Sequence, residues 1–242
     1  MHGIRRAVNG IRKVAAGLRP FNESVWPGLR NDLFVAHESI YGFASRYADH
    51  AEVLDAGCGT GYGSALIAGN ANSVTGVDID PFSIRYAKRK YRSARLHFEV
   101  ADLQALAFED SFDLVVASNS LEHLSHPERF VANAKRALRH DGVLIVAVPP
   151  IYTDHDAQAH EHIHYHRANF AIRQWHDLIA GQGFRVSAFS HLPSDPRVTP
   201  DFSANTPSLL SASDFVFNAV TPERIGDAVS ITAIFVAEAD GG

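Results

Sequence analysis

The sequence predicts an α/β protein built on a mostly parallel sheet with helices on both faces. Strand-like and helix-like segments alternate along most of the chain, and such units cover both faces of a sheet. A glycine-rich turn after the first strand indicates that the sheet carries a nucleotide-type ligand. Five segments are predicted as strands, near 52–56, 73–78, 95–100, 112–117 and 142–148. Four helical segments lie near 62–69, 81–92, 127–139 and 168–181.

Local residues support several of these boundaries. Pro81 and Pro127 stand at first-turn positions of their predicted helices, and Asp80 suits the cap of the first. Asp141-Gly142 is a turn signal before the last apolar run.

The N-terminal part is expected to form a helical cap, at 1–50, on a core domain at 51–242. Residues 32–47 read as a helix. Residues 1–20 carry arginine and lysine but no acidic residue, with apolar residues at helical spacing. Such a helix either makes weak contact with a membrane surface or an acidic partner, or packs over the ligand site with a solvated outer face.

The C-terminal part changes character. Residues 183–190 and 230–237 alternate apolar and polar side chains, as half-buried strands do. The connection at 193–229 is rich in Pro, Ser, Asp and Asn, with a short apolar segment at 215–217. Connections of this length are usually functional or disordered. We expect a substrate lid at 193–229, with a disordered insertion as the alternative.

Composition limits the classes of function. A chain of 242 residues can bury a full core, and its net charge of −5 argues against a broad nucleic-acid-binding face. Cys58 is the sole cysteine, which excludes an internal disulfide and fits a reducing, cytoplasmic location. No run approaches the roughly 20 apolar residues of a transmembrane helix.

The glycine turn identifies the type of ligand. The segment Val53–Gly63 runs from an apolar strand ending at Asp55 into Gly57, Gly59 and Gly61. A dinucleotide fingerprint requires Gly-x-Gly-x-x-Gly. Counted from Gly57, the third glycine would be at Tyr62, and counted from Gly59, it would be at Ser64. The pattern present is Asp-x-Gly-x-Gly-x-Gly.

Acidic residues end two further predicted strands. Asp78 follows the glycine turn by roughly 20 residues, a spacing suited to hydrogen bonds with ribose hydroxyls. Asp102 ends the next strand, and the apolar run at 112–117 leads into Ser118 and Asn119.

Together, these four motifs resemble those of the class I S-adenosylmethionine (SAM) dependent methyltransferases, over about residues 30–185. The resemblance implies a Rossmann-like seven-stranded sheet in the order 3-2-1-4-5-7-6, ending in an antiparallel hairpin. It implies SAM as cofactor, converted to S-adenosylhomocysteine. The glycine turn and Asp55 would surround its amino-acid end. The expected cofactor-binding residues are Asp55, Gly57, Gly59, Gly61, Tyr62, Asp78, Ile79, Asp102, Leu103 and Asn119.

Within the resemblance, Asp78 and Ile79 correspond to the ribose-binding motif. The carboxylate of Asp102 and the backbone N–H of Leu103 correspond to groups that contact adenine. Asp55 would order the loop and reach the methionine amino group through water.

Two histidines are the candidate catalytic residues. Methyl transfer to a hydroxyl requires an oriented acceptor and a base for its proton. His123 follows the fourth predicted strand in Glu122-His123, where family members commonly carry Glu-His; the alternative is that the pair only shapes the loop. His164 follows the fifth strand, where many small-molecule members carry an acceptor-facing histidine, with His162 the next candidate.

No metal ligand is assigned from the sequence. The histidines at 160, 162, 164 and 166 would share one side of an extended segment and could hold a transition metal, or they form a solvated loop. The region is also similar to small-RNA 2′-O-methyltransferases, which bind Mg²⁺ through Glu-x-x-Glu-His and a later histidine. Here Asn119 replaces the first glutamate, and an amide is a poorer Mg²⁺ ligand.

The sequence is thus interpreted as a methyltransferase acting on a small-molecule or glycan acceptor, at a hydroxyl oxygen and not on nucleic acid. Three alternatives remain: N-methylation of a metabolite, a non-catalytic SAM-binding module, and an NAD-type oxidoreductase, against which the glycine spacing counts. The acceptor and the oligomeric state are not determined.

Overall fold

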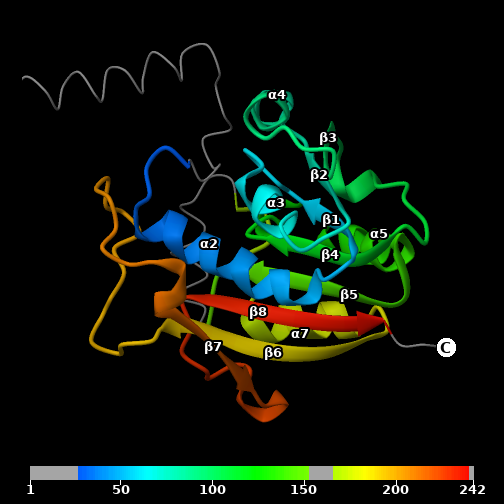
Figure 1. Ribbon diagram of the computed structural model, residues 1–242. Helices are drawn as coiled ribbons and strands as arrows, with labels where there is room; N and C mark the ends of the chain where they lie inside the picture. The colour runs from blue at the N-terminus through cyan, green and yellow to red at the C-terminus, as the bar shows by residue number, and fades with distance from the viewer. Residues whose placement is uncertain (1–26, 153–165, 240–242) are drawn as a thin grey trace, which may run out of the picture.

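The computed structural model describes residues 27–152 and 166–239, which form a single sheet with helices packed on it (Figure 1). The strands are β1 (Glu52–Ala56), β2 (Ser73–Asp78), β3 (Leu96–Val100), β4 (Phe112–Ser118), β5 (Leu138–Val148), β6 (Phe184–Pro193), β7 (Phe215–Val220) and β8 (Thr232–Ala239). The α-helices are α2 (Asp32–Ala44), α3 (Tyr62–Ile67), α4 (Pro81–Lys90), α5 (Pro127–Ala137) and α7 (Ile172–Ala180). The expected segments at 1–20 and 155–164 lie outside the described residues.

The strand order is β3-β2-β1-β4-β5-β8-β6-β7. The first five strands in this order run parallel, and β8, β6 and β7 continue the sheet in antiparallel pairs. Strands β1 and β4 lie at the centre, where Leu54, Leu114 and Val115 are fully buried. The residues at the middle of both strands are apolar, because a strand covered on both faces has no solvent side for polar residues.

The expected number of seven strands is wrong by one. Phe215–Val220 adds a strand, β7, at the edge beside β6. The last strand of the chain, β8, therefore takes the place between β5 and β6 that was expected for a seventh strand. Strand β7 comes from the apolar segment inside 193–229. The ring of Phe217 stacks on His191 at a centroid distance of 4.7 Å and on Phe43 of α2 at 4.5 Å. Aromatic contacts with α2 therefore accompany the pairing of this edge strand.

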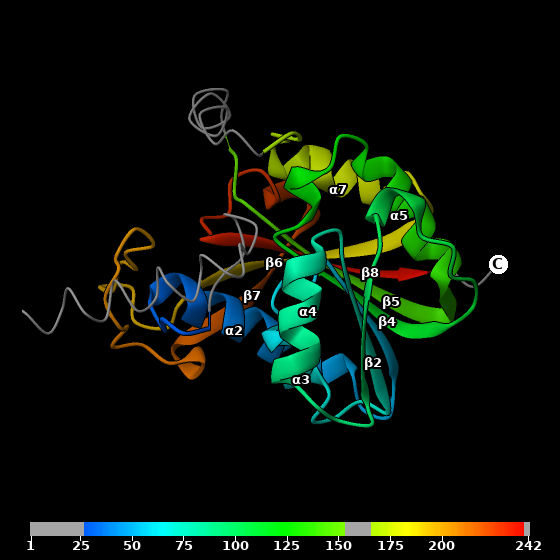
Figure 2. The same cartoon turned by 90° about the horizontal axis from the view of Figure 1, so that it is seen from above.

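Helices cover both faces of the sheet (Figure 2). Helices α5 and α7 pack on one face through side chains that include Phe130 and Trp175. Helices α2 and α3 pack on the other face through Ile40 and Ile67, and α4 covers Phe98 of β3. The predicted α/β architecture is therefore present.

Helix α2 joins the N-terminal part to the insertion. The Asn31 side chain accepts a hydrogen bond from the backbone N–H of Phe34 at 3.0 Å and caps the helix. The same side chain donates to the carbonyl of Ala204 at 3.0 Å, and Asp32 accepts from the backbone N–H of Asp201 at 2.8 Å. The insertion is therefore tied to the start of the helix that crosses the sheet.

Over residues 27–152 and 166–239, no helix combines the length and the apolar character needed to cross a membrane.

Candidate functional site

A cavity of about 760 Å³ lies beside the carboxyl ends of β1, β2 and β4. Ligands of open α/β sheets bind at this edge, and the volume is within the roughly 300–1,000 Å³ of small-molecule sites. Its lining comprises His37, Tyr41, Gly57, Cys58, Gly59, Thr60, Tyr62, Asp78, Ile79, Asp102, Leu103, Gln104, Ser118, Asn119, Ser120, His123, Leu124, Ser125 and Arg167.

The glycine turn between β1 and α3 forms one wall. Gly57, Gly59 and Gly61 have φ angles of 81°, 51° and 81°, a conformation that favours glycine. A Cβ atom on Gly57 would lie 2.6 Å from Cβ of Ser120, and one on Gly61 would lie 2.8 Å from Cβ of Ala87. The turn therefore needs glycine at both positions for close packing as well as for backbone conformation.

Asp55 supports this turn from beneath. Its fully buried carboxylate accepts hydrogen bonds from the hydroxyls of Tyr41, at 3.1 Å, and Ser64, at 2.5 Å. Burial raises the pKa of Asp55 to about 6, against the lowering effect of these bonds. Asp55 is not among the residues that line the cavity, and its side-chain hydrogen bonds join the end of β1 to α2 and α3.

Asp78 ends β2 at the cavity wall. Its carboxylate accepts the backbone N–H of Gly59 at 2.8 Å and that of Asp80 at 2.9 Å. Burial raises the pKa of Asp78, and the two backbone bonds act in the opposite direction. Asp78 thus links the second strand to the glycine turn while lining the cavity beside Ile79.

Asp102 and Leu103 line the cavity after β3. The Asp102 carboxylate accepts the backbone N–H of Gln104 at 2.9 Å and caps a short 3-10 turn at Leu103–Ala105. The end of the third strand is therefore also at the cavity.

Asn119 follows β4 with a φ of 47°, and its backbone N–H donates to the carbonyl of Ala147 at 2.8 Å. Its side-chain Nδ2 lies 3.3 Å from Nε2 of His37, a residue of α2 that also lines the cavity. The His37 Nδ1 lies 3.2 Å from the hydroxyl of Tyr62. Burial lowers the pKa of His37 to about 4, so this imidazole is neutral at neutral pH although it faces the cavity.

The structure gathers most of the residues singled out from the sequence. Those that line the cavity are Gly57, Gly59, Tyr62, Asp78, Ile79, Asp102, Leu103, Asn119 and His123. Asp55 and Gly61 lie behind the wall, and His164 lies outside the described residues. No described residue of 193–229 is among those that line the cavity.

Sequence reasoning missed the contribution of α2. His37 and Tyr41 are four residues apart, so they share one face of the helix, and both line the cavity. This spacing was visible in the sequence, but nothing local showed that the helix crosses the cavity. Arg167, just after the histidine-rich segment, was missed as well.

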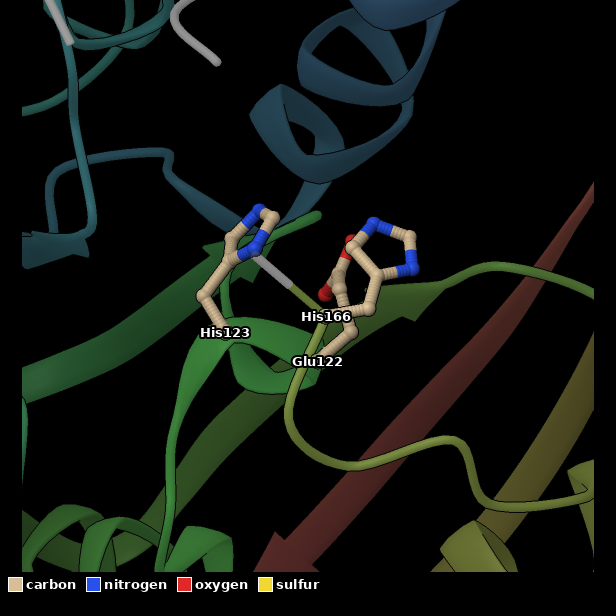
Figure 3. Close-up of side chains that lie close together, drawn as sticks. All are labelled: Glu122, His123 and His166. Atoms are coloured by element: carbon tan, nitrogen blue, oxygen red, sulfur yellow. The ribbon is translucent and has the colours of Figure 1, made fainter. Parts of the chain in front are cut away.

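One group of side chains beside the cavity could hold a metal ion. The ligand atoms of Glu122, His123 and His166 all lie within 4.8 Å of one another (Figure 3).

Known proteins match this chain in sequence. Residues 54–146 match the family model described as a methyltransferase domain. A protein of Mycolicibacterium smegmatis named as a probable SAM-dependent methyltransferase is 32% identical over 167 residues, 68% of this chain and 64% of that protein. A malonyl-[acyl-carrier protein] O-methyltransferase of Paenibacillus is 31% identical over 155 residues, 57% of this chain and 56% of that protein. The chain thus spans less than two thirds of either curated relative.

The fold has close counterparts among solved structures. The crystal structure of a SAM-dependent methyltransferase from Thermotoga maritima superposes with a TM-score of 0.63 at 15% identity and covers 99% of each chain. A parallel sheet with a glycine turn and strand-end acids around one cavity defines a nucleotide-cofactor protein of the Rossmann-like class. With the matches in sequence, the chain belongs to the class I SAM-dependent methyltransferases, and SAM is its cofactor.

The described residues fit this cofactor. The glycine backbone lets a ligand approach closely, and Asp78 offers carboxylate oxygens at the cavity wall.

Proposed function

We propose that this protein transfers the methyl group of SAM to an oxygen atom of a small-molecule or glycan acceptor, with a hydroxyl as the expected group. One observation carries the proposal: the cavity that holds the glycine turn and Asp78 is also lined by two imidazoles, those of His37 and His123. An imidazole can orient a hydroxyl by accepting its hydrogen bond and can take up its proton.

We assign the cofactor contacts by residue. Asp78 and Ile79 are proposed to contact the ribose, and Asp102 with the N–H of Leu103 the adenine. The backbone of Gly57 and Gly59, with Tyr62 and Asn119, is proposed to surround the amino-acid end. Asp55 and Gly61, which lie behind the wall, would act by holding the turn in place.

SAM supplies an already activated methyl group, so the protein must orient the acceptor oxygen and remove its proton. We assign orientation to His37, because its neutral imidazole, with a pKa of about 4, is a weak base. The acceptor hydroxyl is proposed to take the place of the Asn119 amide at Nε2, the one ring nitrogen that accepts hydrogen bonds. His123 is proposed as the base. His164 stays a second proposed base, at a position outside the described residues.

We propose that the insertion at 193–229 acts as a substrate lid through α2, as part of a helical cap around the site. Its support is the set of contacts with Asn31 and Asp32, which tie the insertion to the helix that carries His37.

One observation supports oxygen as the methylated atom: a relative is named as a malonyl-[acyl-carrier protein] O-methyltransferase. The net charge of −5 disfavours nucleic acid. A cytoplasmic location is proposed from the single cysteine, which excludes an internal disulfide.

Incubation of the pure protein with methyl-labelled SAM and size-fractionated extract of its source tests this proposal. Label is expected in a small-molecule or glycan fraction, and it should be absent with an Asp78→Ala variant. Hydriodic acid should release the label as methyl iodide if it is an O-methyl ether, and mild alkali should release it as methanol if it is a methyl ester. Label that resists both treatments would contradict O-methylation, and label in RNA or protein would contradict the acceptor class. SAM binding without transfer to any fraction would favour a binding module.

A further inference from the structure

Three side chains with metal-binding atoms converge beside the cavity. Glu122 and His123 belong to the 3-10 turn at Leu121–His123, which follows β4. His166 comes from the segment before α7, more than 40 residues later in the chain. One carboxylate oxygen and one nitrogen from each imidazole lie within 4.8 Å of one another. Figure 3 shows the Glu122 carboxylate between the two rings.

Backbone hydrogen bonds hold the two segments together. The N–H groups of Arg167 and Ala168 both donate to the carbonyl of Glu122, at 2.7 Å and 3.0 Å. The rings of His123 and His166 meet edge to face, with centroids 5.2 Å apart. These backbone hydrogen bonds and the ring contact therefore hold the turn that carries Glu122 and His123 against the segment that carries His166.

The Glu122 side chain is placed where a carboxylate is costly. The residue is only 3% exposed, and burying an ionised carboxylate requires a compensating positive charge or strong hydrogen bonds. Two imidazoles lie directly beside it, and both are partly exposed. A bound cation would offset the burial of this charge, and ions could enter from the side of the histidines.

The donor set indicates the class of ion. Two imidazole nitrogens and one carboxylate suit Zn²⁺ and the first-row transition metals, whereas Mg²⁺ and Ca²⁺ prefer oxygen ligands throughout. Ligands at about 2.0–2.2 Å from Zn²⁺ lie roughly 3–3.5 Å apart, so small side-chain rotations would close the present spacing. We propose that Glu122, His123 and His166 form a binding site for a divalent transition metal ion, with Zn²⁺ as the reference ion.

The site differs from a four-ligand magnesium site. Asn119, which precedes the pair by three residues, has its amide nitrogen 3.3 Å from Nε2 of His37. Its side chain is therefore engaged with His37, and the proposed ligands are one carboxylate and two imidazoles. Three protein ligands leave a coordination position for water or a substrate oxygen.

The site borders the cavity, because His123 and Arg167 line it. This placement has a consequence that rests on the proposed function. An ion ligated by His123 would take over the role assigned to that imidazole, since a metal lowers the pKa of an oxygen acid bound to it. Metal binding itself requires neither SAM nor an acceptor, so it is tested separately.

The test uses the full chain, stripped with EDTA and titrated with Co²⁺ under optical absorption, then with Zn²⁺ in competition. The ligand variants are Glu122→Gln, His123→Asn and His166→Asn. His126→Asn is the matched control, because His126 lies three residues beyond His123, exposed, with its Nδ1 3.2 Å from Glu128. A second control replaces the histidines at 155, 160, 162 and 164 with asparagine, because that segment could bind the same ions.

The wild type is expected to bind one Co²⁺ with a visible d–d spectrum and to release it to Zn²⁺. Each ligand variant should weaken binding by more than roughly 100-fold, since loss of even an outer-shell partner costs 10–100-fold. Both controls should bind as the wild type does. Wild-type affinity in His166→Asn, or loss of binding in the four-histidine control alone, would overturn the proposal. Circular dichroism and Tm establish that the variants are folded, and His166→Asn suffices if Glu122→Gln does not fold.

Discussion

Nε2 of His37 on α2 lies 3.3 Å from Nδ2 of Asn119 at the end of β4. As placed, the amide donates, so the ring nitrogen accepts and Nδ1 carries the proton toward the Tyr62 hydroxyl at 3.2 Å. This pair joins the N-terminal helix to the edge of the sheet at the cavity. It places a neutral imidazole in the wall of the cavity that the glycine turn also lines.

The first prediction concerns His37. His37→Asn should lower kcat/KM for the acceptor by roughly 10–100-fold, because an orienting hydrogen bond is lost. The Kd for SAM, measured by calorimetry, should change less than about threefold. Tyr62→Phe removes only the hydroxyl partner and should give a smaller loss on the order of 3–10-fold. An equal loss of SAM affinity in both variants would show that His37 serves the cofactor instead.

Asp78→Ala should weaken SAM binding by at least roughly 100-fold, because each hydrogen bond to a charged group contributes about 1.5–3 kcal/mol. Calorimetry with SAM measures the effect, and far-UV circular dichroism checks the fold. Asp49→Ala is the control, because that side chain is 82% exposed. Full SAM affinity in Asp78→Ala would refute the ribose assignment.

Two glycine substitutions should act in opposite directions. Gly57→Ala places a Cβ 2.6 Å from that of Ser120 at a φ of 81°, and should destabilise the fold by roughly 2–4 kcal/mol. Gly42→Ala lies inside α2 with no atom within 4 Å of the new Cβ, and should stabilise it by roughly 0.5–1 kcal/mol. Urea unfolding of both variants measures the difference. A tolerated Gly57→Ala would mean that the turn adopts another conformation in solution.

Asp55 should make stability depend on pH. Its folded-state pKa of about 6 lies above the ordinary value of 3.8, so the folded protein holds the proton more tightly than the unfolded chain. Deprotonation of Asp55 therefore lowers the free energy of unfolding as pH rises from about 4 to about 6, by up to about 3 kcal/mol. Asp55→Asn lacks this titration, so its stability relative to the wild type should increase over that interval. Urea unfolding at pH 4, 5, 6 and 7 measures the difference, and a difference independent of pH would contradict the shift.

Asp32→Ala should loosen the insertion. The Asp32 carboxylate accepts the backbone N–H of Asp201 and the hydroxyl of Ser208, and loss of one such bond costs about 1.5–3 kcal/mol. Limited proteolysis within 200–210 should therefore accelerate by roughly 10-fold. Glu38 lies on the same helix and forms a partly exposed ion pair with Arg30, which precedes the helix. Glu38→Ala should leave the cleavage rate nearly unchanged. Equal cleavage rates for Asp32→Ala and the wild type would show that the Asp32 contacts do not hold the insertion against α2.

The sequence alone determined the α/β architecture, the glycine turn and the family. These depend on local patterns: apolar runs of strand length, glycines where the backbone turns sharply, and acids such as Asp78 directly after a strand. Parallel strands bring their carboxyl ends to one edge of the sheet, so residues chosen one motif at a time came together at one cavity.

Only the tertiary structure decided the rest of the site. His37 and Tyr41 reach the cavity because α2 packs across the sheet, and His166 meets Glu122 because backbone bonds join segments far apart in sequence. The additional strand, β7, packs through ring contacts of Phe217 with His191 of β6 and Phe43 of α2, residues from three separate elements. Such contacts depend on how distant elements pack, and no periodicity or spacing within a single segment specifies that packing.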